Sequence, residues 1–249
     1  MNDYQPNNQR YNRPETWPPQ QQGDWGGSLQ ASTAAQAGVA ERMSFVRKVY
    51  ALFFAATLFA VAGVGLGLSY TPLLRFAFQH PFIMLFAMLG GVMGAQAVRH
   101  VPVLNLFALF AFTAFTGVVI SPLIALYTQL NPASILQAGV LTVGIFGGLT
   151  AYVFISKKDF SFLRGMVTVG LIVVVLAGLL NIFLVGSSAF SFAISVAVLL
   201  LFSGFVLYDT SNIIRRYPVN EYIAGALSLY LDAFNIFLAL LNILNAGRR

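Results

Sequence analysis

The sequence of 249 residues contains no cysteine and few charged residues. Without cysteine the chain has no disulfide framework, no thiolate metal site and no nucleophilic thiol. Charged residues make up only 9% of the chain, with 14 Lys and Arg against 8 Asp and Glu, whereas soluble domains average about a quarter. The glycosylation sequons Asn-x-Ser and Asn-x-Thr are also absent. These absences exclude a disulfide-stabilised secreted domain.

Apolar residues are what the chain has in abundance, since 58% of it is hydrophobic and the mean hydropathy is +0.77. A membrane-spanning helix needs about 20 mainly apolar residues, and seven runs come close to that length or exceed it. We therefore predict an all-α integral membrane protein whose residues 44–249 form one domain, a seven-helix bundle. The predicted helices are 46–69, 82–98, 102–127, 134–156, 162–186, 189–214 and 222–245.

Residues 1–43 differ from the rest of the chain in composition. They are rich in Gln, Asn, Pro, Gly and Ser, and such segments contain too little apolar surface to offset the entropy cost of ordering. A secretory signal would place its apolar core within about the first 30 residues, whereas the first apolar run here begins near Val49. We expect a disordered N-terminal tail that stays in the cytoplasm.

Basic residues predict the orientation of the bundle in the membrane. Of the twelve basic residues from Arg42 onward, nine fall on the side of the N-terminus and of the even-numbered loops, and three fall on the opposite side. By the positive-inside rule the N-terminus is then cytoplasmic. Seven full spans place the C-terminus outside, and a last segment that dips in and returns places it inside. Because these residues mark the ends of apolar runs, the net charge of +6 does not indicate nucleic acid. The composition and the missing sequons favour a bacterial inner membrane.

Small residues recur within the spans at spacings that let helices approach closely. The first span contains three alternate glycines, and two other spans each contain a pair four residues apart. We expect helix packing at these positions, which are Gly63, Gly65, Gly67, Gly90, Gly94, Gly144 and Gly148.

Two aspartates lie inside apolar runs near the C-terminus: Asp209 in FVLYDTSNII and Asp232 in ALSLYLDAFNIF. A carboxylate at the bilayer centre costs about 2.5 to 3.5 kcal/mol or more, so such groups face a bundle interior, a partner or a water cavity. At about 100° per residue, Ser228 and Asn235 lie within about 60° of Asp232 on the helix. This polar stripe cannot face lipid, and it predicts that the last helix is central in the bundle.

Asp209 shares its helix face with Asn212 and Arg216, which lead toward the cytoplasmic end. Counting residues from the helix ends gives a depth of about 9 Å for Asp209 and about 16 Å for Asp232, so direct pairing requires a tilt or a longer helical connection. If the two carboxyls do approach, they would hold one proton between them. If both ionise, they would attract water or a hard cation such as Ca²⁺. The alternative is that each aspartate only hydrogen-bonds backbone within a packed bundle.

The segments LYDTSNI, ALSLYLDAFNIFLALLNIL and ISKKDFSFL, on a layout of a tail and seven spans, resemble the Bax inhibitor family from about residue 44 onward. The resemblance implies a central last helix wrapped by two three-helix layers, and a pH-dependent calcium leak. It also implies a di-aspartyl sensor at Asp209 and Asp232 and a basic latch residue at Arg99. Arg216 is a second candidate latch. An acidic residue of a bacterial relative's second span has no counterpart here, since Met88 occupies its place.

Two other functional classes compete with a leak. Intramembrane aspartyl proteases also carry aspartates on adjacent spans, but their second aspartate follows Gly-x-Gly, where this chain has Leu229, Tyr230 and Leu231. We therefore expect no enzyme. A non-conducting protein that modulates a membrane quality-control protease or other membrane partners remains as the second hypothesis.

The ligands that the sequence favours are the lipid bilayer, protons and calcium. We expect no cofactor, with Ca²⁺ as a transported or transiently bound ion that meets Asp209 and Asp232. Ser228, Asn235 and Asn212 are candidate pore-lining or supporting residues. His80 and His100 have no cysteine or helical histidine partner for a zinc site.

Overall fold

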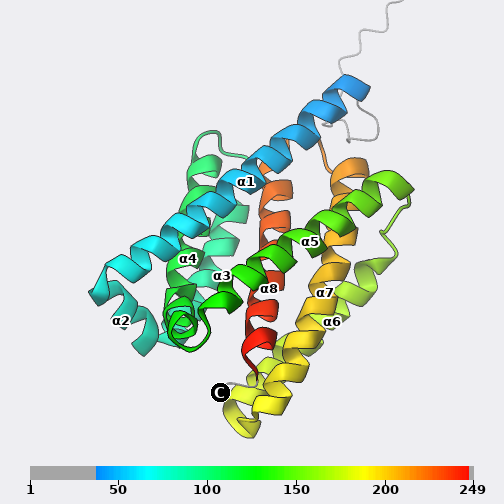
Figure 1. The fold of residues 1–249 in the computed structure, drawn as a ribbon. Coiled ribbons are helices and arrows are strands. Elements are labelled where there is room, and N and C mark those ends of the chain that lie inside the picture. Colours follow the sequence, from blue (N-terminus) through cyan, green and yellow to red (C-terminus); the bar gives the residue numbers. More distant parts are fainter. Residues whose placement is uncertain (1–37, 247–249) are drawn as a thin grey trace, which may run out of the picture. The chain divides into compact units, whose positions relative to one another are not determined.

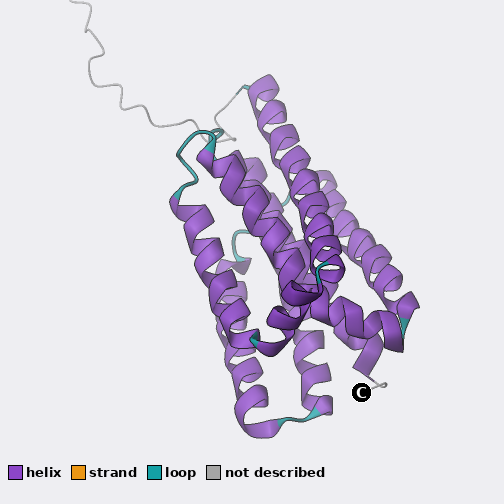
Figure 2. Ribbon diagram, turned by 90° about the vertical axis from the view of Figure 1, so that its left-hand side faces the viewer, coloured by secondary structure: helices purple, strands orange, loops and turns teal. Residues whose placement is uncertain are grey.

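The computed structural model describes residues 38–246, without the side chain of Leu184. In that range the chain is helical and contains no strand, which confirms the all-α prediction (Figure 2). Short loops join the helices. The elements are α1 (Val39–Ser69), α2 (Thr71–Gln79), α3 (Pro81–Ala97), α4 (Leu104–Leu130), α5 (Pro132–Ser156), α6 (Leu163–Leu180), the π-helix η1 (Asn181–Val185), α7 (Ser188–Arg215) and α8 (Tyr222–Asn245).

Six helical segments in the described range are long and apolar enough to cross a membrane: α1, α4, α5, α6 with the start of η1, α7 and α8. The predicted second span, 82–98, corresponds to α3, which follows α2 at a bend of 95°. Each of these two helices has a proline in its first turn, at Pro72 and Pro81, where the missing N–H costs no hydrogen bond. Seven spans result only if α2 and α3 together count as one.

The helix boundaries match the apolar runs closely, with two departures. α1 begins at Val39, so residues 39–43 of the predicted tail are helical. Residues 1–37 lie outside the described range. The predicted span 162–186 ends in η1, whose last residue Val185 is followed by Gly186 at a φ of 59°. Such left-handed backbone favours glycine.

α8 lies in the middle of the bundle and contacts α1, α4, α5 and α7 (Figure 1). Its buried side chains lie on several sides of the helix, as expected for a helix surrounded by protein. On α6, by contrast, only Val167 is buried. The outer surfaces of the helices are mostly apolar and exposed, which suits contact with lipid.

Close packing of α1 on α4 depends on glycine. A Cβ at Gly63 would overlap the carbonyl oxygen of Ala114, and one at Gly117 would overlap that of Ala60. The other predicted positions differ. Gly67 lies against Ser121, but Gly65, Gly90, Gly94, Gly144 and Gly148 have no atom of the described residues within 4 Å of a Cβ. The prediction of helix packing at those five glycines is wrong, because these sides of the helices face outward.

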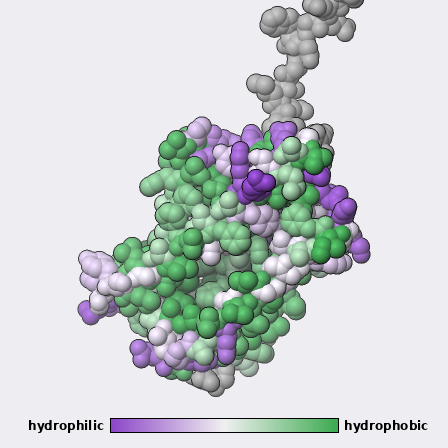
Figure 3. All heavy atoms as spheres, turned by 45° about the horizontal axis from the view of Figure 1, so that its top comes forward, coloured by the Kyte–Doolittle hydropathy of each residue, from purple (hydrophilic) through white to green (hydrophobic). Residues whose placement is uncertain are grey.

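The charged residues collect at one end of the bundle, where α7 ends and α8 begins. We call it the arginine end, after Arg99, Arg164, Arg215 and Arg216. In Figure 3, with that end turned forward, hydrophilic side chains gather there above apolar flanks. At the opposite end, η1 and the start of α7 border a pocket whose polar lining residues are neutral: Asn181, Ser188, Ser191, Ser195 and Asn242.

Candidate functional site

Asp232 lies near the middle of α8 and is almost fully enclosed, with 3% of its surface exposed. Its Oδ2 atom is buried and has no hydrogen-bond partner among the described residues. Neighbouring residues of α8, Leu229, Tyr230 and Phe234, are buried apolar or aromatic side chains. An unpaired buried polar oxygen costs about 1–3 kcal/mol. The buried Asp232 carboxyl therefore lowers the stability of the packed bundle.

Asp209 of α7 is half-buried, and its charge interacts with that of Asp232. Within the described chain the two carboxyls form no hydrogen bond with each other. The side chain of Ser228, on α8, interacts with the Asp209 carboxyl and donates a hydrogen bond of 3.1 Å to the Gly225 carbonyl. Despite the depth difference estimated from residue counts, the fold brings the two aspartates into electrostatic range.

Tyr217, in the loop between α7 and α8, is a member of this site that sequence reasoning missed. Burial and, next, the nearby Asp209 carboxyl raise the pKa of Tyr217 to about 12. Its hydroxyl also interacts with Ser228. The phenol therefore stays neutral near pH 7 and can donate a hydrogen bond toward the aspartates. Only its place directly after Arg215 and Arg216 could have indicated it.

The predicted supporting asparagines bond mainly within their own helices. Asn235 Nδ2 donates to the Leu231 carbonyl at 2.8 Å. Asn212 is buried, and its Oδ1 accepts from Arg216 Nη1 at 3.4 Å. Neither amide bonds to an aspartate in the described residues. Their hydrogen bonds tie them to the backbone and to arginine.

The candidate latch residue Arg99 pairs with Glu221, the residue before α8. Its Nε atom lies 3.5 Å from Glu221 Oε2 and donates to His100 Nε2 at 3.0 Å. The other Glu221 oxygen lies 3.3 Å from His100 Nε2. Since Glu221 directly precedes α8, these contacts tie the α3–α4 loop to the start of the central helix.

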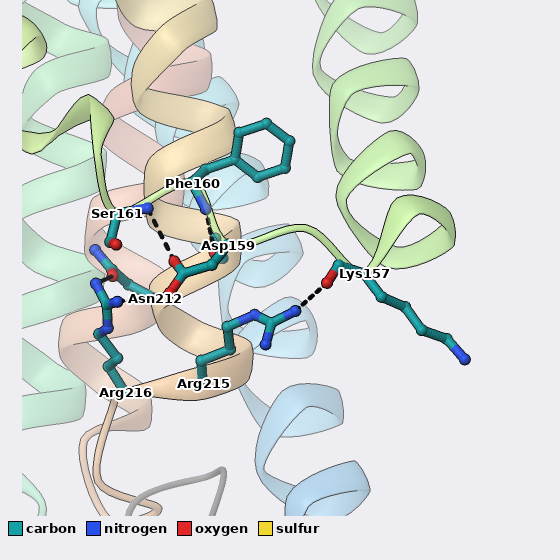
Figure 4. Close-up of polar contacts among 8 residues, drawn as sticks. Lys157, Asp159, Phe160, Ser161, Asn212, Arg215 and Arg216 are labelled. Carbon is teal, nitrogen blue, oxygen red and sulfur yellow. Dashed lines mark hydrogen bonds and ion pairs between the residues drawn. The ribbon is translucent and has the colours of Figure 1, made fainter.

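Arg216 joins the end of α7 to the α5–α6 loop (Figure 4). Its Nη2 lies 2.7 Å from Asp159 Oδ2, and neighbouring bonds run from Arg215 to the Lys157 carbonyl and from the Phe160 amide to Ser211 Oγ. We call this set of contacts the loop clasp. Like Arg99, Arg216 holds a loop in place.

The pKa of Asp159 in the loop clasp is lowered. The main cause is the hydrogen bond that its carboxylate accepts from the backbone N–H of Ser161, and the charges of Arg216 and Arg215 add to it. This N–H···O bond is 2.9 Å long. The carboxylate is thus ionised throughout the neutral pH range and available to the arginines.

An open pocket of about 550 Å³ lies at the arginine end, between these loops and the aspartate-bearing helices. Its walls include Arg99, Arg164 and Arg216 together with Tyr208, Tyr217 and Glu221. We call it the arginine pocket. Tyr208 directly precedes Asp209, so the pocket reaches the helix turn that carries the outer aspartate.

The described part of the chain contains no group of three or more His, Cys, Asp or Glu side chains that could hold a metal ion. The aspartate pair on its own offers two carboxyl groups. Their four oxygens are fewer than the six to eight oxygen ligands that a resident calcium ion takes, so an ion there would keep water as ligands.

Comparisons with known proteins agree with the fold and with the sequence resemblance. Residues 42–249 match the family described as inhibitor of apoptosis-promoting Bax1. Protein lifeguard 4 of the mouse is 36% identical over 218 residues, which cover 86% of this chain and 90% of that protein. A Golgi anti-apoptotic protein of vaccinia virus is 33% identical over 88% of this chain and 92% of its own length. An uncharacterized protein of Campylobacter jejuni is 38% identical over 81% of this chain and 88% of its own length.

Proposed function

The chain belongs to the Bax inhibitor family, and we propose that it lets calcium or a similar cation leak across its membrane at a rate set by protonation of Asp209 and Asp232. One observation carries this proposal. Asp209 and Asp232 lie on the packed helices α7 and α8 inside an apolar bundle, close enough for their charges to interact, while one oxygen of Asp232 has no partner in the described residues.

The pair responds to protons because two neighbouring carboxyls in an apolar bundle cannot both ionise without strong repulsion. With one of the two carboxyls protonated, this repulsion is absent and α7 and α8 stay packed. Loss of that proton adds repulsion across the α7–α8 contact and draws in water or a hard cation, for which carboxylate oxygens are preferred ligands. Ser228 and Tyr217 take part as neutral hydrogen-bonding groups beside Asp209.

The membrane arrangement that goes with this function has seven spans, with α2 and α3 counted as one. α8 is the central helix, and three spans lie in a layer on either side of it. The arginine end faces the cytoplasm, because basic residues concentrate there and cytoplasmic loops carry such an excess. The membrane is a bacterial inner membrane.

We also propose that the aspartates perform no covalent chemistry. Asp232 lies within an uninterrupted helix, between the buried residues Tyr230 and Phe234, which leaves little room for a peptide substrate. Incubation with a reporter transmembrane peptide should give no hydrolysis. Cleavage that disappears in Asp232→Ala would make the protein an aspartyl protease.

Calcium flux into liposomes containing the purified protein tests the leak. Wild-type flux should change with pH, and the flux–pH curve should flatten in Asp209→Asn and in Asp232→Asn, because each variant keeps only one carboxyl and loses the repulsion between two. Asp159→Asn is the matched control, since it removes a carboxylate from the loop clasp and should leave the pH response intact. Flux that is equal in protein-free liposomes, or a pH response that survives both substitutions in the pair, would refute the proposal.

Removal of residues 1–37 separates a leak from a protein that acts only through partners. The helices begin at Val39, so the bundle that carries the aspartates is retained. We expect the truncated protein to keep its flux and its pH response. If the truncated protein loses its flux, the result supports the modulator hypothesis and contradicts a leak through the bundle.

A further inference from the structure

Three arginines converge on the arginine pocket from separate parts of the chain. Arg99 belongs to the α3–α4 loop, Arg164 to the first turn of α6, and Arg216 follows the last residue of α7. The positive-inside rule accounts for basic residues at this end, but it does not require them to share a pocket. Arg42 and Arg47, on α1 at the same end, do not line it.

The carboxylates at the pocket do not balance these charges. Glu221 pairs with Arg99, and Asp159 pairs with Arg216 from the side of the loop clasp. Three arginines against these two carboxylates leave one positive charge in excess. The side chain of Arg164 has no ion pair or hydrogen bond in the described residues, so the uncompensated charge is located there.

We propose that the arginine pocket binds a phosphate-type oxyanion, with Arg164 as its main ligand and Arg99 and Arg216 as further donors. Guanidinium groups present paired N–H donors that match the oxygens of a phosphate, and the pocket of about 550 Å³ has room for such a group. The anion competes with Glu221 for Arg99 and with Asp159 for Arg216. This inference is independent of the cation leak.

The anion has two sources, the headgroup of an acidic membrane lipid and a free phosphate in solution. Both present the same oxygens to the arginines, and the pocket is open at the bundle end where headgroups and solvent meet. Binding should therefore be measured in two arms with the full-length protein. One arm titrates inorganic phosphate into protein in detergent at constant ionic strength, and the other compares phosphatidylcholine nanodiscs with and without phosphatidic acid.

Arg164→Gln should weaken binding by about tenfold, equivalent to about 1.4 kcal/mol. Arg164→Lys should restore part of the loss, because the charge returns without the planar fork. Arg47→Gln is the matched control. It removes the same charge from an exposed site at the same end of the bundle and should leave binding unchanged.

Variants that lack a competing carboxylate give the sharper test, because a merely structural role predicts the opposite sign. Glu221→Gln and Asp159→Asn should each tighten binding, since Arg99 or Arg216 is then released to the anion. Glu41→Gln, at an exposed site of α1, should not. Saturable binding in either arm with this pattern supports the site and identifies the source. The proposal is overturned if neither arm saturates, or if Arg47→Gln weakens binding as much as Arg164→Gln.

Discussion

Two helix contacts in this bundle are built in opposite ways. In the glycine seam between α1 and α4, Gly63 and Gly117 bring one backbone against the other, so that even a methyl group has no room. In the aspartate seam between α7 and α8, the contact contains Asp209, Asp232 and the unpaired Oδ2 atom of the latter. Close-packed backbone allows no rearrangement, whereas an unsatisfied polar group gains from one. The glycine seam is the fixed part, and the aspartate seam is the part suited to respond.

The largest effect is expected from a side chain placed in the glycine seam. Gly117→Leu should lower the free energy of unfolding by more than about 3 kcal/mol, above the usual range for overpacking, because its Cβ already overlaps the Ala60 carbonyl. Thermal unfolding in detergent and size-exclusion chromatography measure the loss. Gly144→Leu is the control, since its outward side has no described atom within 4 Å. Equal destabilisation by both would mean that the close contact at Gly117 is not the cause of the loss.

The contrast between Gly117 and Gly144 also shows what the sequence alone does not predict. Long apolar runs predict the spans because a helix in lipid must satisfy its own backbone groups. The small-xxx-small spacing of Gly144 and Gly148 predicts a contact that the fold does not make. Gly117 has no such partner glycine in its own helix. Spacing along one helix cannot indicate which face meets a neighbour, since that depends on the packing of helices remote in sequence.

The same limit applies to the candidate site. Asp209 and Asp232 could be selected from the sequence because ionisable residues in apolar runs are rare and costly. Tyr217 could not, because it lies in a polar loop and joins the aspartates only through the turn between α7 and α8. The partners of the arginines, Glu221 and Asp159, likewise depend on how the loops fold back. The bend between α2 and α3 could not be predicted either, because the sequence run that it interrupts is too short to reveal it.

A gain in stability is expected when the aspartate seam is made apolar. Asp232→Val should raise the free energy of unfolding by about 1–2 kcal/mol, because it removes the buried oxygen that has no partner in the described residues. The same variant should lose the pH response that we propose for the cation flux. Thermal unfolding of wild type and variant measures the first effect. A clear drop in stability would show that Asp232 makes a stabilising contact, and the contrast between the two seams would fail.

A smaller loss of stability is expected when the hydrogen bond between the helices of the two seams is removed. Tyr230 of α8 and Thr116 of α4 share a buried hydroxyl–hydroxyl contact. Tyr230→Phe should cost about 0.6 kcal/mol, and at most about 1.7, as is typical of bonds between membrane helices. A double-mutant cycle with Thr116→Val isolates the pair. A coupling energy of zero would mean that this contact does not link the two seams energetically.

The smallest effect is expected at the loop clasp, which lies outside both seams. Asp159→Asn should change the free energy of unfolding by only a few tenths of a kcal/mol, because exposed ion pairs contribute little. Since the folded-state pKa of Asp159 lies below the ordinary value for aspartate, the clasp is intact above that ordinary value, about pH 4. It weakens only as pH falls through the lowered pKa. Hydrogen exchange of the Ser161 amide should therefore stay constant from neutral pH down to about pH 5, after correction for the intrinsic rate. If protection of that amide changed together with the leak, the loop clasp would belong to the proton-sensitive part of the molecule, and the division between fixed and responsive contacts would have to include it.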